Sequence, residues 1–444
     1  MKKAVKTALR FLGYEIRRLP QPLPADLREF IRANSRDLEL APVGRSPAGA
    51  TAAPKPFIEG KKSLIVEGWR FHAHSYAVVN QWQLLALARR PDMAIRIRDK
   101  PFLNSQWKAQ ADLFTDTDEA TLQRLGPAAS SDSADVTLRT TFPFDFSTSN
   151  SGITAVFGTT EYQTLQPDMI RDPVMFDAID RREWIPDVRV ITPSRWSANG
   201  FYRAGFDEKQ VLIIPHGVDL GLFRPDPMLR AEVRRKLSIP EGAFVFLTVG
   251  AMTSNKGIDL LLKAFIEVSR TFPHARLVLK GLDSLYGSKD LLISMLQKIP
   301  PHERGRVLKQ MVYLGKSMSF RELAALYCGA DAYMSPYRAE GFNLPVLEAA
   351  ACGLPVLCTM GGPTDDFVLD SFARRVESRL RPFEVNGREL VMLEPDLEHL
   401  TALMRSVVDD HEWRKEAAVS ARAHAAARFT WDHIVDALVT KLWS

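Results

Sequence analysis

Cysteine is scarce in this 444-residue sequence, and long apolar runs are absent from it. The three cysteines, Cys328, Cys352 and Cys358, lie in apolar contexts, and an odd number without a pairing pattern fits a reducing compartment. No run approaches the roughly 18 apolar residues that a membrane-spanning helix needs. The basic start is not followed by the apolar core and cleavage site of a signal peptide. A cytoplasmic protein is therefore expected.

Clusters of metal-binding side chains are also lacking. His72 and His74 are two residues apart, so they would diverge by about 200° in a helix. No other group of Cys and His stands close together in the sequence, so no metal site is expected. There is no dense basic patch with interleaved aromatic residues, and nucleic-acid binding is not expected either.

What the sequence does contain is enough apolar material for two domains. Hydrophobic residues make up 46% of the chain, and the net charge of +5 is compatible with nucleotide phosphates or an anionic membrane surface. Residues 1–56 read as an extension. Its first 20 residues combine basic and apolar positions at helical spacing. Such a basic amphipathic helix could either lie on an anionic membrane or dock on its own domain or on a partner protein. Residues 41–56 are rich in Pro and Ala and are typical of a linker.

Strands and helices alternate through the rest of the chain, which predicts two doubly wound parallel sheets. The first domain is expected over 57–225 and the second over 226–427, with a closing helix in 428–444. Ligands of such sheets bind at the carboxyl ends of the strands. In the first domain, this rule points to the loops at 68–75, 99–102, 142–149 and 216–219. In the second domain, the polar stretch 280–290 is expected to be a loop.

Residues 332–359 are the most informative stretch, because they read strand, loop, helix, strand. Asn343 is expected to cap the helix, Pro345 is tolerated in its first turn, and Gly353 supplies a left-handed stop. Ser319 and Glu322 predict a capping box on the preceding helix.

Two carboxylates, Glu340 and Glu348, bracket the start of the helix in this stretch. A helix N-terminus has unpaired N–H groups and a partial positive charge, which suit a phosphate. Fixed carboxylates beside it suit sugar hydroxyls. On an ordinary unit of this kind, both glutamates would simply face solvent.

Other candidate site residues follow strands of the same sheet. Lys256 stands between a buried strand and a helix, where it could neutralise a diphosphate, although a lone lysine there is more often a surface charge. Gly361 and Gly362 would allow close backbone approach to a ligand. In the first domain, Asp145 is a candidate carboxylate among aromatic residues, and a loop cap is an equal alternative.

The stretch EGFNLPVLEAAACGLPVLCT resembles the E-x7-E motif of the retaining glycosyltransferases of family 4, the group 1 glycosyltransferases. The similarity extends over roughly residues 60–435, with VGAMTSNKGIDLLLKAF resembling the loop that binds the donor diphosphate. This resemblance implies a GT-B fold, with two Rossmann-like domains. The N-terminal one takes the acceptor, the C-terminal one takes a nucleotide-sugar, and the last helix returns to the first domain.

The resemblance also assigns roles. Glu340 would contact the donor sugar, Lys256 the diphosphate, and Glu348 the ribose, and neither a metal nor a cofactor is implied beyond the nucleotide-sugar itself. Ala251 stands where the family usually has an arginine, and Asn255 and Lys280 are candidates to compensate. The remaining candidates are the donor-binding Gly341, Phe342, Asn343, Leu344 and Gly362, and the first-domain residues His74 and Asp145, with His72 as an alternative to His74.

The expected function is therefore transfer of a hexose to a glycan or lipid-linked acceptor, as in surface polysaccharide or glycoconjugate biosynthesis. The basic N-terminal stretch makes contact with the inner face of a membrane an expectation as well. Two alternatives remain at this stage: a nucleotide-sugar epimerase on the same fold, and a non-catalytic nucleotide- or carbohydrate-binding protein. The missing arginine supports the second alternative.

Overall fold

The computed structural model describes residues 23–34, 38, 40 and 60–444. The basic segment 1–20 and the linker 41–56 expected from the sequence lie outside the described residues. The chain divides into two compact units. One contains the described residues up to 40 together with 218–428, and the other contains 60–217 together with 429–444.

The unit that contains residues 60–217 is built on a seven-stranded parallel sheet in the order β3-β2-β1-β4-β5-β6-β7. Buried apolar residues dominate its central strands, as expected for a sheet covered on both faces. The strands are β1 Lys62–Gly68, β2 Met93–Asp99, β3 Gly126–Pro127, β4 Val136–Thr140, β5 Ile153–Phe157, β6 Arg189–Thr192 and β7 Val211–Ile213.

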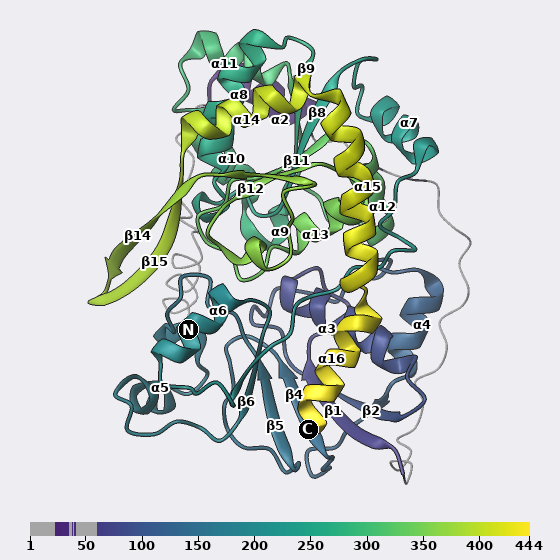
Figure 1. Ribbon diagram of the computed structural model, residues 1–444, viewed down its shortest axis with the longest axis vertical. Helices are drawn as coiled ribbons and strands as arrows, with labels where there is room; N and C mark the ends of the chain where they lie inside the picture. The colour runs from purple at the N-terminus through teal and green to yellow at the C-terminus, as the bar shows by residue number, and fades with distance from the viewer. Residues whose placement is uncertain (1–22, 35–37, 39, 41–59) are drawn as a thin grey trace. The chain divides into compact units, whose positions relative to one another are not determined.

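The helices of this unit include the last one of the chain. They are α3 Ser75–Ala88, α4 Asp116–Arg124, η1 Pro167–Met169, α5 Pro173–Asp180, α6 Arg195–Arg203 and α16 Trp431–Trp443. The helix α16 lies beside α3 (Figure 1). A Cβ on Gly217 would lie 2.7 Å from the backbone of Trp431, so only glycine allows this approach. The C-terminal helix thus returns to the first sheet, as the resemblance implied.

The second unit is built on a six-stranded parallel sheet in the order β10-β9-β8-β11-β12-β13. Its strands are β8 Phe244–Val249, β9 Ala275–Lys280, β10 Met311–Leu314, β11 Ala332–Ser335, β12 Val356–Thr359 and β13 Ala373–Val376. Its helices are α2 Ala25–Ala33, α7 Pro227–Lys236, η2 Ser254–Lys256, α8 Ile258–Thr271, α9 Asp283–Tyr286, α10 Ser288–Leu296, α11 Pro301–Leu308, α12 Phe320–Cys328, α13 Leu344–Ala351, η3 Pro363–Asp366, α14 Leu397–Asp409 and α15 His411–Arg428.

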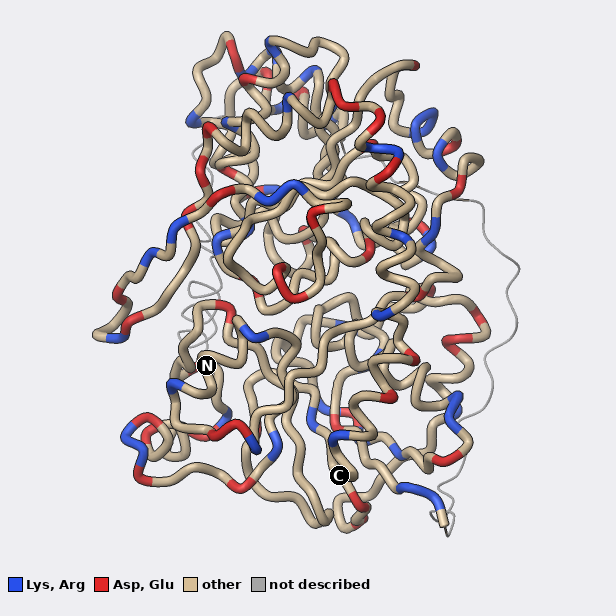
Figure 2. The backbone as a smooth tube through the Cα atoms, in the orientation of Figure 1, with Lys and Arg blue, Asp and Glu red and all other residues tan. Residues whose placement is uncertain are grey.

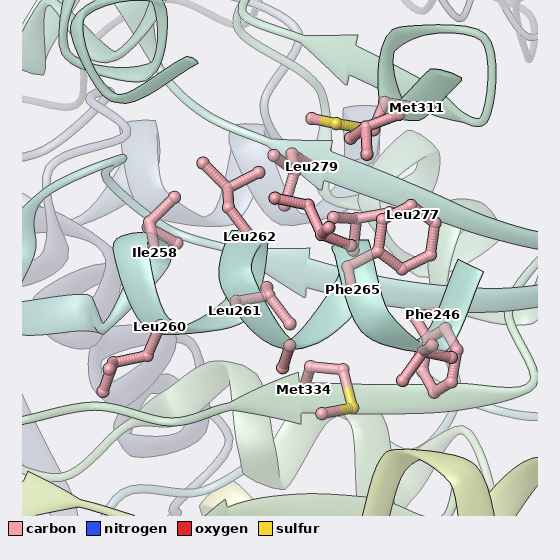
Figure 3. Close-up of a cluster of buried hydrophobic side chains, with 14 of the residues drawn as sticks. Phe246, Ile258, Leu260, Leu261, Leu262, Phe265, Leu277, Leu279, Met311 and Met334 are labelled. Carbon is pink, nitrogen blue, oxygen red and sulfur yellow. The ribbon is translucent and has the colours of Figure 1, made fainter. Parts of the chain in front are cut away.

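One large apolar cluster holds α8 against this sheet. Figure 3 shows Leu261 and Phe265 of α8 among Leu277 of β9 and Met334 of β11, and all four are fully buried. Burying a side chain of this size stabilises the fold by roughly 1.5–3 kcal/mol. The cluster fixes α8, and therefore the loop that precedes it, on the sheet.

Three features of this unit differ from the sequence-based expectation or were missed by it. The stretch 280–290 is not a loop throughout, because α9 and the start of α10 occupy it, with Gly287 in a left-handed conformation between them. The short helix α2 was not foreseen. It buries Leu27 and Phe30 in the α8 cluster, and its Asp26 forms an ion pair with Arg304 at 2.7 Å.

The third feature is an antiparallel hairpin, β14 Ser378–Val385 and β15 Arg388–Pro395. Figure 2 shows positive and negative residues interspersed along it. Asn386 and Gly387 both have positive φ at its turn, which is the two-residue turn that matches strand twist. Leu390 and Leu393 of β15 are buried, so one strand of the hairpin is attached to the body of the unit.

Candidate active site

The loop between β8 and α8 is held tightly against the chain that follows β11. Gly257 adopts φ 69° just before α8, and a Cβ at this position would lie 1.8 Å from the backbone oxygen of Pro336. The backbone oxygen of Asn255 accepts hydrogen bonds from the N–H groups of Arg338 and Ala339, at 2.7 and 3.2 Å. The sequence therefore brings the Lys256 loop and the Glu340 loop together through backbone contacts.

Lys256 and Glu340 meet at this junction. The Nζ atom of Lys256 lies 2.7 Å from Oε2 of Glu340, and the two side chains are 22% and 11% exposed. A half-buried ammonium that retains access to solvent can pair with a phosphate as well as with this carboxylate. Ala251 and Met252 are buried in the same loop, so the position of the family's arginine is filled by apolar packing.

The side chain of Asn343 does not cap the start of α13. Asn343 occupies the N-cap position with φ 79°, and its Nδ2 atom donates a hydrogen bond to Oγ of Ser335 at 2.8 Å. The structure confirms Asn343 at the N-cap position, Pro345 in the first turn and the left-handed Gly353, although the Asn343 side chain makes no capping hydrogen bond. Gly341 precedes Phe342, whose ring stacks on Phe367 with centroids 4.5 Å apart.

Glu348 lies one turn into α13 and is 5% exposed. Its Oε2 atom accepts a hydrogen bond from the hydroxyl of Tyr327 on α12 at 2.7 Å. Burial raises the pKa of Glu348 to about 7, and the hydrogen bond from Tyr327 offsets only part of this effect. A buried carboxylate with one remaining oxygen is a suitable acceptor for a pair of hydroxyls.

Lys280 and Gly362 lie at the carboxyl ends of two other strands of the sheet, Lys280 as the last residue of β9 and Gly362 in the turn after β12. Nζ of Lys280 donates to the backbone oxygens of Gly281 and Lys316, the second at 2.8 Å. Burial lowers the pKa of Lys280 to about 8. Gly362 follows β12, and a Cβ there would lie 2.4 Å from the hydroxyl of Tyr337, so this turn also requires glycine.

Arg338 joins three elements around the Lys256–Glu340 pair, and sequence reasoning did not identify it. Its guanidinium contacts Asp259 of α8 at 2.7 Å and Glu394 of β15 at 3.1 Å, and it donates to the backbone oxygen of Ser254 at 2.8 Å. The backbone oxygen of Arg338 accepts from the N–H of Leu393 at 2.8 Å. The arginine thus fixes the hairpin and the Lys256 loop to the chain that carries Glu340. No spacing pattern signals it.

His72 and His74 of the other unit both lie beside the ring of Trp107, and this unit is described by itself. His74 is the N-cap of α3, where its Nδ1 atom accepts from the N–H of Tyr76 at 3.3 Å. The ring of His72 stacks on Trp107 with centroids 5.0 Å apart. Burial lowers the pKa of His74 to about 3, with a smaller contribution from His72.

Asp145 accepts hydrogen bonds within its own loop and pairs with an arginine. Its Oδ1 atom accepts from Oγ of Ser147 at 2.6 Å and lies 3.4 Å from Nη1 of Arg139. Burial raises its pKa, but the Ser147 hydrogen bond and the Arg139 charge outweigh that effect and keep the pKa below the usual value. The carboxylate is 22% exposed, so it keeps partial access to solvent.

A second charged cluster near Asp145 was also missed. Glu67 is buried next to the last residue of β1, and the parallel register places Arg98 of β2 and Arg139 of β4 beside it. Arg139 and Lys100 both lie 3.0 Å from Oε2 of Glu67, and Arg98 contacts its other oxygen. A glutamate inside the apolar run SLIVEG is the signal that could have revealed this cluster.

Some of the candidate site residues expected from the sequence therefore lie close together in the structure, whereas others belong to the other unit. Lys256 and Glu340 are in direct contact, Asn255 connects their loops, and Glu348 lies on the helix that follows Glu340. His74 and Asp145 belong to the other unit. Among the described residues, no group of three or more His, Cys, Asp or Glu side chains is arranged to hold a metal ion.

Two Rossmann-like sheets, one with a candidate ligand site at the carboxyl ends of its strands, define the GT-B fold, and solved structures support this class. HepE of Anabaena in complex with UDP and glucose superposes with a TM-score of 0.61 at 15% identity, covering 86% of this chain and 99% of that one. A glycosyltransferase from Rickettsia africae gives a TM-score of 0.62 at 12% identity, covering 86% and 98%. At these identities the similarity establishes the fold alone.

The sequence comparisons point to the second unit. Residues 230–421 match the model of the group 1 glycosyl transferases, so this part of the chain is similar to that family. The D-inositol 3-phosphate glycosyltransferase of Kineococcus radiotolerans is 30% identical over 239 residues, which cover 52% of this chain and 51% of that protein. The chain thus spans about half the length of the curated relatives it matches.

Among the described helices, none combines the length and the apolar character that crossing a membrane demands.

Proposed function

We propose that this protein is a retaining glycosyltransferase that moves a hexose from a nucleotide-diphosphate sugar to an acceptor hydroxyl, without a metal ion. The observation that carries the proposal is the Lys256–Glu340 contact of 2.7 Å beside the uncapped start of α13, with the buried Glu348 one turn further on. The family match of residues 230–421 and the sugar-nucleotide complexes of the Anabaena protein support it.

The chemistry of the site follows from its charges. Lys256 would pair with the diphosphate when the donor binds, and the N–H groups at Leu344 and its neighbours would add the positive end of the helix. Both offset the negative charge that develops on the leaving group in the transition state. Glu340, released from Lys256, would accept hydroxyls of the sugar, and Glu348 would accept those of the ribose.

The acceptor and its location belong to the same proposal. We expect a glycan or lipid-linked acceptor to bind on the unit with residues 60–217, with His74 and Asp145 as the candidate contacts. The role in surface polysaccharide or glycoconjugate biosynthesis and the position at the inner face of a membrane rest on the family resemblance and on the basic start of the sequence.

The test is calorimetric titration of the purified protein with UDP, GDP, ADP, dTDP and their common sugars, in the presence of EDTA. We expect one nucleotide to bind tightly, and Glu348→Ala to abolish that binding. The product formed with a sugar acceptor would then be analysed by NMR for the anomeric configuration, and retention is expected.

Two outcomes would contradict the proposal. Nucleotide binding without release of sugar to any acceptor would favour a non-catalytic binding protein, which the apolar Ala251 position also allows. Conversion of the donor sugar in the absence of acceptor would identify an epimerase.

A further inference from the structure

Lys280 is an unusual residue for the place it occupies. It is the last residue of β9 and only 6% exposed, yet among the described residues it forms no ion pair with a carboxylate. An ammonium group has three N–H donors. Two of them reach the backbone oxygens of Gly281 and Lys316, and the third has no acceptor within the described part of the chain.

The position of Lys280 relates it to Glu348. Leu277 and Leu279 of β9, and Ala332 and Met334 of β11, belong to the α8 cluster on one face of the sheet. Because side chains alternate along a strand, Lys280 and Tyr333 lie on the opposite face.

The same face carries Glu348. The hydroxyl of Tyr333 bonds to the backbone of Val249 in the intervening strand β8, and its ring centroid lies 5.8 Å from that of Tyr327, whose hydroxyl donates to Glu348. The strands β9, β8 and β11 are neighbours, and Lys280 pairs with Val249 whereas Tyr333 pairs with Leu247, so Lys280 and Tyr333 lie roughly 12 Å apart across the sheet.

We infer that Lys280 selects the nucleobase of the donor by donating its third N–H to a carbonyl oxygen at position 4 of a pyrimidine or position 6 of a purine. This inference rests on the proposed function, in which Glu348 holds the ribose and Lys256 the diphosphate. The base is the remaining part of the nucleotide, and Lys280 is a cation at the end of a strand on the Glu348 face. Uridine, thymidine and guanosine carry this oxygen, whereas cytidine and adenosine carry an amino group that would set N–H against N–H.

The experiment compares matched nucleotides that differ at this position. UDP and CDP differ there by oxygen against amino, and IDP and ADP differ in the same way on a purine. We expect calorimetry on the wild-type protein to show UDP bound at least tenfold more tightly than CDP, or IDP at least tenfold more tightly than ADP, depending on the ring size that the site accepts. Equal affinities within both pairs would overturn the inference while leaving the proposed function intact.

A variant at Lys280 tests whether this side chain causes the difference in nucleotide affinity. Lys280→Met keeps the length of the side chain and removes its donors, so the ratio within the preferred pair should fall to about one. Lys263→Met, on the exposed face of α8, is the matched control and should keep the wild-type ratio. A folded Lys280→Met protein with an unchanged ratio would mean that Lys280 only ties two loops together. If this variant does not fold, the UDP/CDP and IDP/ADP affinity ratios of the wild-type protein still test the inference. Failure of every nucleotide to bind would reject the proposed function together with this inference.

Discussion

At the scale of single residues, the site consists of ionisable groups held at unusual degrees of burial. Lys256 and Glu340 form an ion pair, and Glu348 is buried and accepts a hydrogen bond from a tyrosine hydroxyl. Such groups are costly to keep in a stable fold, and they are found more often at functional sites than elsewhere.

Removal of the Lys256 ammonium should affect catalysis more than folding. We expect Lys256→Ala to lower kcat/KM for donor turnover by at least about tenfold, equivalent to about 1.4 kcal/mol of transition-state stabilisation. The measurement is steady-state kinetics, with Lys263→Ala as the control on the exposed face of α8. A smaller loss would exclude Lys256 from charge stabilisation of the leaving group.

Glu348 should make stability depend on pH. Because burial raises its pKa from 4.5 to about 7, the folded protein holds a proton there that the unfolded chain has already lost. The resulting stability is complete below about pH 4.5 and disappears as the pH rises through 7. At about 1.4 kcal/mol per pKa unit, the loss amounts to about 3 kcal/mol.

The measurement for this prediction is urea unfolding at pH 5 and pH 8. Glu348→Gln keeps an acceptor for the Tyr327 hydroxyl and lacks the ionisation. We expect the wild type to lose stability relative to this variant between the two pH values. Parallel pH profiles for the two proteins would show that Glu348 ionises freely in the fold.

At the scale of elements, the site depends on how closely one loop approaches another. Gly257 permits the backbone contact with Pro336, and Arg338 connects the loops to the hairpin β14–β15. Neither feature contacts a ligand in the proposed mechanism, so both act through the position of Lys256.

Gly257 should be far less tolerant of a methyl group than a glycine of similar conformation. Gly257→Ala adds a Cβ 1.8 Å from a backbone oxygen, whereas Gly242→Ala, with a similar φ of 73°, meets nothing within 4 Å. The left-handed conformation alone costs about 1–2 kcal/mol in both variants. We expect chemical unfolding to show a clearly larger loss for Gly257→Ala, together with weaker nucleotide binding. Equal losses of stability in the two variants would mean that the Gly257 loop shifts away from Pro336 without a cost in free energy.

Arg338 should act as a positioning residue. Arg338→Met leaves Asp259 and Glu394 without their shared cation, so we expect the Lys256 loop to lose its fixed position and KM for the donor to rise several-fold. Arg381→Met removes the more exposed partner of Glu394, which lies 3.2 Å away, and should leave KM unchanged. A KM in Arg338→Lys that lies between those of the wild type and Arg338→Met would separate the effect of the charge from that of the packing.

The sequence predicted those elements whose signals are local. Strand, loop and helix from Ala332 to Ala351 could be located because apolar runs and the Pro345 and Gly353 signals mark their ends. The role of the Asn343 side chain could not be predicted from the sequence, because the loop brings it next to its partner Ser335 only in the folded protein. Arg338 could not be found for the same reason, since its partners come from α8 and β15.

At the scale of the whole molecule, the chain passes between its two units three times. Described residues up to 40 belong with 218–428, and residues 60–217 belong with 429–444. The sequence did not predict the helix α2, because its apolar residues pack against a core that is formed by residues more than 200 positions later in the chain.

The contribution of α2 to stability can be measured directly. Phe30 is 5% exposed within the α8 cluster, so Phe30→Ala should lower the free energy of unfolding by about 3–5 kcal/mol. Glu29→Ala, on the exposed face of the same helix, should change it by less than about 0.5 kcal/mol. Similar values for the two variants in thermal or chemical unfolding would show that α2 is not an integral part of this unit.

The contacts of α2 also determine how the protein can be divided for production in the laboratory. Oδ1 of Asn34, just after α2, accepts a hydrogen bond from the N–H of Tyr313 at 2.8 Å, and Tyr313 belongs to β10 at the edge of the six-stranded sheet. A fragment cut as residues 218–428 would expose this edge and the apolar surface under Leu27 and Phe30, which favours aggregation. A synthetic peptide that spans α2 and Asn34, added in trans, should restore a soluble fragment.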